Sequence, residues 1–187
     1  MNNSTRPTSV KIGFTAAASA FEAAHLWVEY LNGGVLSHHL LANPDLPAIS
    51  NWWGLVVIPV LTWFLVGRIQ SRVARQNAFQ SAAPRIPSTI MIAFTAALAY
   101  GAALSFAFVS NFEWISAVFL GAFAVALVVP VYRAEYLLGF VLGMTFTFGA
   151  VLPLIIGAVI AVFSRLVHLA FSAAVRLIRN QPVSRAQ

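Results

Sequence analysis

The sequence predicts an all-α integral membrane protein: one domain over 1–187, with a bundle of about five, or six, transmembrane helices and a C-terminal basic amphipathic helix. Hydrophobic residues make up 60% of the 187 residues and charged residues only 9%, whereas a soluble domain carries about 25% charged residues. A spanning helix needs about 20 apolar residues. The chain therefore has room for such a bundle and for no separate soluble domain.

The basic residues indicate the class of partner. The formal net charge is +6, but these residues lie at the ends of apolar segments and form no patch interleaved with aromatic rings, as a nucleic-acid surface would. We therefore expect a lipid bilayer as partner and no nucleic acid. The chain contains no cysteine, which excludes disulfides and any thiolate-ligated cofactor.

Five apolar segments predict spanning helices, at 12–31, 51–69, 88–109, 114–131 and 136–163. The second opens on two indoles, Trp52 and Trp53, which are typical of an aromatic belt. The third carries a small-xxx-small series, Ala93, Ala97 and Gly101, which allows close helix approach and predicts a place inside the bundle.

The last apolar segment, 136–163, is longer than one crossing needs, and Pro153 interrupts it. We expect it to be kinked, re-entrant or split. From Ser164 onward basic residues recur on one helical face. This pattern predicts an amphipathic helix at 164–180, which we interpret as a membrane-surface anchor rather than a partner-binding helix.

Basic residues also predict the orientation. If the first four segments each cross, one side receives Arg6, Lys11, Arg68, Arg72, Arg75, Arg85 and Arg133. The positive-inside rule makes that side cytoplasmic, so the 31–50 loop faces outward and the 70–87 linker is cytoplasmic, in what we expect to be a bacterial inner membrane. Five crossings, which we favour, leave the basic C-terminal residues outside, whereas a hairpin near Pro153 gives an even count. A cleaved signal peptide over 1–20 is a further alternative, although its apolar run is short.

Three ionisable residues, Glu22, His25 and Glu29, lie within the first apolar segment. A helix turns about 100° per residue, so the three side chains share one face. Each would cost roughly 2.5 to 3.5 kcal/mol against lipid, so the face should meet protein or water. Glu29 is expected near the outer end and Glu22 about 10 Å deeper. Such a ladder suits a proton or cation pathway, because a histidine can change protonation near neutral pH.

The same residue types are ligands for a divalent metal such as zinc, iron, manganese or copper. The hypothetical ligand set combines the stripe with the outer loop and comprises Glu22, His25, Glu29, His38, His39 and Asp45. The Glu22-x-x-His25 spacing matches that of di-iron carboxylate bundles, but those need two copies and only one is present. We also expect Arg133 and Glu135 to form an interfacial pair.

The leading functional hypothesis is a small membrane transporter, channel or sensor for a cation, either a proton or a divalent metal. One alternative is a membrane-embedded metal-dependent enzyme acting on a lipid-soluble substrate. Another is a non-catalytic subunit whose polar stripe pairs with another protein, and which assembles with copies of itself or other membrane proteins through Gly139 and Gly143. A purely structural role, in which His25 and a carboxylate satisfy each other, is the remaining reading. The sequence has no Gly-rich phosphate loop, nucleophile elbow or HExxH motif.

Overall fold

The apolar segments form helices in the structure, a computed structural model that describes residues 5–39, 43, 45–77 and 86–179. The α-helices are α1 (Thr5–Leu31), α2 (Gly54–Asn77), α3 (Ser88–Val109), α4 (Ile115–Val128), α5 (Ala134–Phe148) and α6 (Val151–Arg179). Within the described ranges, three stretches are long and apolar enough to cross a membrane: 51–76, 88–109 and 151–179. The helices α4 and α5 are shorter and also apolar. This composition of helices indicates an integral membrane protein.

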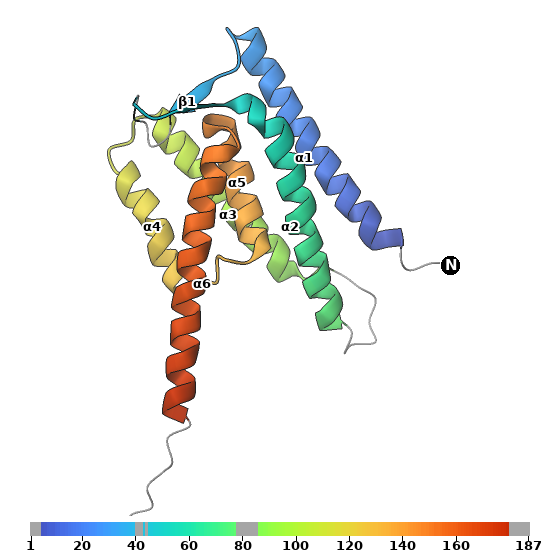
Figure 1. Cartoon of the computed structure of the whole chain (residues 1–187), viewed down its shortest axis with the longest axis vertical. Coiled ribbons are helices and arrows are strands. Elements are labelled where there is room, and N and C mark those ends of the chain that lie inside the picture. Colours follow the sequence, from blue (N-terminus) through green and yellow to red (C-terminus); the bar gives the residue numbers. More distant parts are fainter. Residues whose placement is uncertain (1–4, 40–42, 44, 78–85, 180–187) are drawn as a thin grey trace, which may run out of the picture.

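Successive helices alternate in direction along the molecule (Figure 1). The C-terminal ends of α2 and α6 point toward the lower end of Figure 1, and the turn between α5 and α6 lies at the upper end. The arginines near the ends of α2 and α6 therefore lie toward the same end of the molecule.

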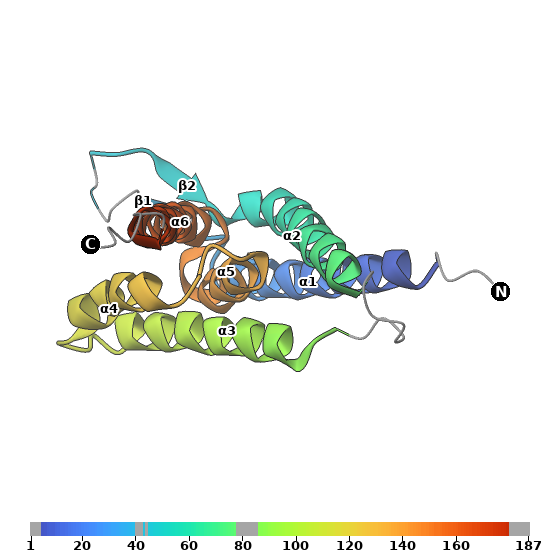
Figure 2. The same cartoon turned by 90° about the horizontal axis from the view of Figure 1, so that it is seen from below.

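The helices α3 and α5 run parallel and pack backbone against backbone. An added Cβ on Gly143 would lie 2.9 Å from the amide nitrogen of Ala102, and one on Gly101 would lie 2.6 Å from the carbonyl oxygen of Phe140. Only glycine fits so close an approach. The predicted close contact of 88–109 is confirmed, but its predicted place inside the bundle is wrong. Figure 2 shows α3 at the edge of the bundle, where side chains such as Ile92 are exposed.

The segment 136–163 is split, and the break lies at Gly149 rather than at Pro153. Gly149 has a φ of +66° and ends α5, so the chain can reverse there into α6. Pro153 lies in the first turn of α6, where its missing N–H is not needed for a helical hydrogen bond. The structure thus has the hairpin that the sequence analysis ranked second. The expected separate helix at 164–180 is also corrected, because α6 continues unbroken through Ser164 to Arg179.

The loop after α1 holds a two-stranded antiparallel hairpin, β1 (Ser37–His39) and β2 (Ala48–Ser50). In its register, His38 faces Ile49 and His39 faces Ala48. A short 3-10 helix, η2 (Asn51–Trp53), leads from β2 into α2. The hairpin therefore places the loop histidines beside the C-terminal end of α1 and the start of α2. We call this end of the two helices the outer end, because it lies at the upper edge of the molecule in Figure 1.

Candidate functional site

The polar stripe of α1 faces α2. These two helices are antiparallel, with Glu22 beside Gly54 near one end of the interface and Lys11 beside Gly67 near the other. Glu22 is fully buried, His25 is 6% exposed, and Glu29 is half-buried. The helical spacing thus brings the three residues onto one face, and that face is covered by protein.

Glu22 occupies a space that exists because residue 54 has no side chain. An added Cβ on Gly54 would lie 2.6 Å from Glu22 Cδ and closer still to Oε1. Neither carboxylate oxygen of Glu22 has a hydrogen-bond partner among the described residues. An uncompensated buried charge costs several kcal/mol, so a carboxyl in this position favours a bound proton or cation.

Two threonines continue the polar line away from the outer end. The hydroxyls of Thr15 on α1 and Thr62 on α2 are both buried, and neither has a hydrogen-bond partner in the part of the chain that the structure describes. The antiparallel register that faces Glu22 to Gly54 also places Thr15 and Thr62 at one level. Between them and Glu22, Ala18 and Ile58 pack in an apolar cluster.

Glu29 is the centre of an outer polar cluster. Its Oε1 accepts a hydrogen bond from Asn51 Nδ2 at 2.7 Å and lies 3.4 Å from His25 Nε2. Its Oε2 accepts a hydrogen bond from the backbone N–H of Leu36 at 3.2 Å. Glu29 thereby ties α1 to the loop and to the start of α2, while His25 links this cluster to the level of Glu22.

The turn between α5 and α6 closes over the outer cluster. The ring of His25 lies 4.9 Å from that of Phe146, and no described residue forms a hydrogen bond with the buried Nδ1 of His25. An added Cβ on Gly149 would lie 2.9 Å from Asn51 Cγ. The bare backbone of Gly149 therefore lets Asn51 fit beneath the turn, where it meets Glu29.

His38 joins the outer cluster from β1. Its ring lies 6.4 Å from that of Phe148, and its buried Nε2 has no hydrogen-bond partner within the described ranges. Burial lowers the pKa of His38, and the nearby charge of Glu29 opposes that effect. His38 is therefore held as a neutral imidazole over a wider pH range than a histidine in water.

His39 and Asp45 do not meet the rest of the predicted ligand set. The strand alternates, so His39 turns to the exposed side, where its Nδ1 lies 2.7 Å from the carbonyl oxygen of Leu46. Asp45 is exposed, and its backbone N–H donates to Asn43 Oδ1. No group of three or more His, Asp or Glu side chains among the described residues could hold a metal ion.

A second buried charge lies between α2 and α5. Arg72 Nη2 donates a hydrogen bond to Glu135 Oε1 at 2.7 Å, and Glu135 is 2% exposed. The expected pairing of Glu135 with Arg133 is therefore wrong. Arg133 precedes α5 and is exposed, whereas the first turn of α5 directs Glu135 toward α2.

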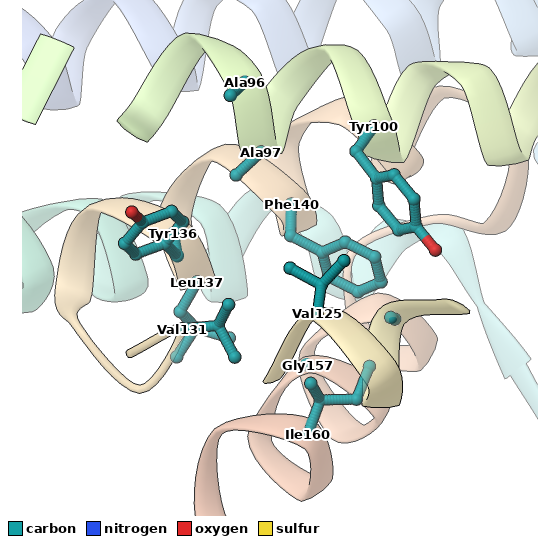
Figure 3. A pocket seen from close by; sticks show the side chains of 11 residues that line it. Ala96, Ala97, Tyr100, Val125, Val131, Tyr136, Leu137, Phe140, Gly157 and Ile160 are labelled. Atoms are coloured by element: carbon teal, nitrogen blue, oxygen red, sulfur yellow. The ribbon is translucent and has the colours of Figure 1, made fainter. Parts of the chain in front are cut away.

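An apolar pocket of about 260 Å³ lies among α3, α4, α5 and α6. Figure 3 shows Tyr100 and Tyr136 on either side of Phe140, with their hydroxyl groups pointing away from it. The Tyr100 hydroxyl already donates to the carbonyl oxygen of Val118. The pocket thus offers packing surface and no charged group, and it is separate from the polar stripe.

Sequence reasoning singled out the acids and histidines and missed their partners. Gly54, Asn51 and Gly149 shape the site, and each reads in the sequence as an ordinary residue of a helix start or turn. The available signal was the glycine that begins an otherwise bulky apolar segment, since such a position can admit a side chain from a neighbouring helix. Searches of family models, curated proteins and solved structures found no match to this chain.

Proposed function

We propose that this chain is a small membrane protein that moves or senses a cation, with a proton as the preferred cation and Glu22 as its binding group. The observation that carries the proposal is the full burial of Glu22 with both carboxylate oxygens unpartnered. A group of this kind is stable only when a proton or cation neutralises it, and groups of this kind inside membranes are typical of ion pathways.

The outer cluster would serve as the entrance. Glu29 and His38 are half-buried, whereas Glu22 is fully buried and lies about 10 Å deeper along α1 at 1.5 Å per residue. His25 lies between the two glutamates along α1, 3.4 Å from Glu29. A proton would pass from Glu29 to His25 and on to the level of Glu22, with the imidazole changing protonation at each transfer.

A proton suits this site better than a divalent metal. A divalent cation needs several oxygen or nitrogen ligands at about 2.0 to 2.6 Å, and the described residues bring no three His, Asp or Glu side chains together around one point. A proton needs one carboxyl oxygen. The metal form of the hypothesis, and the metal-dependent enzyme, would both require these side chains to rearrange.

The inner half of the pathway would follow Thr62 and Thr15 toward Lys11. Lys11 lies at the inner end of the α1–α2 interface, with its ammonium 3.8 Å from the centroid of the Trp63 ring. The placement of the α2 and α6 arginines at one end of the molecule favours that end as cytoplasmic and the 31–50 loop as external. A bacterial inner membrane remains the proposed location.

Metal analysis and flux measurements on one set of proteins test the proposal. We expect purified wild-type protein to bind no stoichiometric divalent metal and to carry a proton current that is reduced in His25→Ala. If wild-type protein binds stoichiometric metal and His25→Ala does not, the cation would be a metal rather than a proton. Wild-type protein with neither metal nor flux, and a His25→Ala variant that loses only stability, would reduce the stripe to a structural role.

A further inference from the structure

A basic groove lies between α2 and α6, apart from the polar stripe between α1 and α2. We define it by its six lining residues, which come from α2, the α4–α5 connection and α6: Arg68, Tyr132, Ala161, Val162, Arg165 and Leu166. Its volume is about 500 Å³. None of these residues belongs to the proposed cation pathway.

Two guanidinium groups are held on the walls of the groove by aromatic rings. The guanidinium carbon of Arg165 lies 5.1 Å from the centroid of the Tyr132 ring, and that of Arg68 lies 5.4 Å from the centroid of the Phe64 ring. Such stacking orients the planar guanidinium and leaves its N–H donors free for another acceptor.

Among the described residues, no carboxyl group pairs with these arginines. The chain has five side-chain carboxyl groups, and each lies within the described residues. Two of them form ion pairs, Glu29 with His25 and Glu135 with Arg72, and no ion pair of the described residues reaches Arg68 or Arg165. The groove therefore carries two positive charges that a ligand can neutralise.

The rest of the groove is apolar and open. Val162 is 59% exposed and Leu166 is 61% exposed, and with Ala161 they lie beside Arg165 on α6. In Figure 1, α6 and α2 both run toward the lower end of the molecule, where the apolar part of α6 gives way to its basic part. A ligand here would meet positive charge and apolar surface together.

We propose that this groove binds the phosphate headgroup of an anionic membrane lipid. Arginine N–H groups bind phosphate oxygens in a bidentate manner, so Arg68 and Arg165 would clasp the phosphate from both walls. An acyl chain would then lie along Ala161, Val162 and Leu166. Basic side chains next to a membrane-spanning helix attract anionic lipids in general, and the groove makes this attraction a defined site.

Native mass spectrometry and thermal unfolding of the full-length protein test the site. The ligand is a short-chain phosphatidylglycerol, compared with the zwitterionic phosphatidylcholine of the same chain length and with inorganic phosphate. We expect phosphatidylglycerol to be retained and to raise the unfolding temperature. In the double variant Arg68→Gln with Arg165→Gln, its affinity should fall by about tenfold or more, because each lost bond is charge-assisted.

The matched control is Arg176→Gln with Arg179→Gln, which removes the same charge from α6 outside the groove. This control should keep the affinity for phosphatidylglycerol within about twofold of wild type, which is well below the roughly tenfold loss expected of the groove variant. An equal loss in both double variants would overturn the proposal in favour of diffuse attraction. Inorganic phosphate binding as well as the lipid would overturn it in favour of a free-anion site. A misfolded variant would also lose the lipid, so Arg68→Lys with Arg165→Lys provides a second check. This variant keeps the charge and should bind phosphatidylglycerol with intermediate affinity.

Discussion

Gly54→Ala tests whether the position of Glu22 matters for function rather than for folding. Gly54 has φ −57° and ψ −35°, a right-handed helical conformation that alanine adopts without strain. The new Cβ, however, would lie 2.6 Å from Glu22 Cδ and closer still to Oε1. Ordinary carbon contacts are about 3.5 to 4.0 Å, so Cδ must withdraw by roughly 1 Å and Oε1 by more.

The cost to stability should be modest, because the group that must move is the end of a flexible side chain. Overpacking a buried site costs about 1 to 3 kcal/mol, and we expect the lower end of that range. Proton flux in liposomes should nevertheless fall to the level of Glu22→Gln. In the double variant Gly54→Ala with Glu22→Gln, flux should fall no further, since both changes remove the same group from its site.

Gly13→Ala is the matched control on α1. An added Cβ at residue 13 meets nothing within 4 Å, and alanine is a better helix former than glycine by about 1 kcal/mol. This variant should keep wild-type flux and unfold at the same or a higher temperature. If Gly54→Ala shows only the expected modest loss of stability and yet conducts protons like wild type, the placement of Glu22 beside residue 54 has no functional meaning and our reasoning is wrong.

Three further perturbations address other parts of the structure. Gly143→Ala should lower the free energy of unfolding by about 1 to 3 kcal/mol or more, because its Cβ would meet the backbone of α3. Thermal unfolding of the variant and of wild type measures this loss. Arg72→Gln should cost about 3 to 5 kcal/mol by leaving buried Glu135 unpaired, and the double variant with Glu135→Gln should be more stable than that single variant. Burial lowers the pKa of His38 in the folded state, and the charge of Glu29 opposes part of that effect. The unfolded chain therefore binds more protons at residue 38 than the folded chain does. The contribution of neutral His38 to stability is complete above the ordinary pKa of 6.5 and declines as the pH falls below that value. Thermal unfolding between pH 5 and 8 should therefore show a larger acid loss in wild type than in His38→Phe.

The helices that sequence predicted best are those with clear chemical limits. Segment 88–109 matches α3, because Pro87 precedes it and the polar residues Ser110 and Asn111 follow it. The end of α5 was missed, because Gly149 is one of several glycines in a continuous apolar run and nothing in composition marks it as the residue with positive φ. Hydropathy indicates which segments can lie in lipid, and it does not reveal a turn between two helices that are both apolar.

The site was predicted in part for a related reason. Helical periodicity is enough to place Glu22, His25 and Glu29 on one face, since that depends only on residues of α1. Which residues meet that face depends on tertiary packing. Asn51, just before α2, donates a hydrogen bond to Glu29, and Glu135 pairs with Arg72 instead of Arg133. His38 and His39 were treated as equivalent, and strand alternation separated them.

Proton flux through Glu22→Gln protein in liposomes tests the central claim most directly. Glutamine has nearly the same shape as glutamate and cannot take up and release a proton at the carboxyl position. The control is Glu113→Gln, which changes an exposed carboxyl group in the connection between α3 and α4. With an imposed membrane potential and a pH-sensitive dye, we predict that wild type and Glu113→Gln acidify the vesicles and that Glu22→Gln does not. A folded Glu22→Gln protein that conducts protons as fast as wild type would contradict the account.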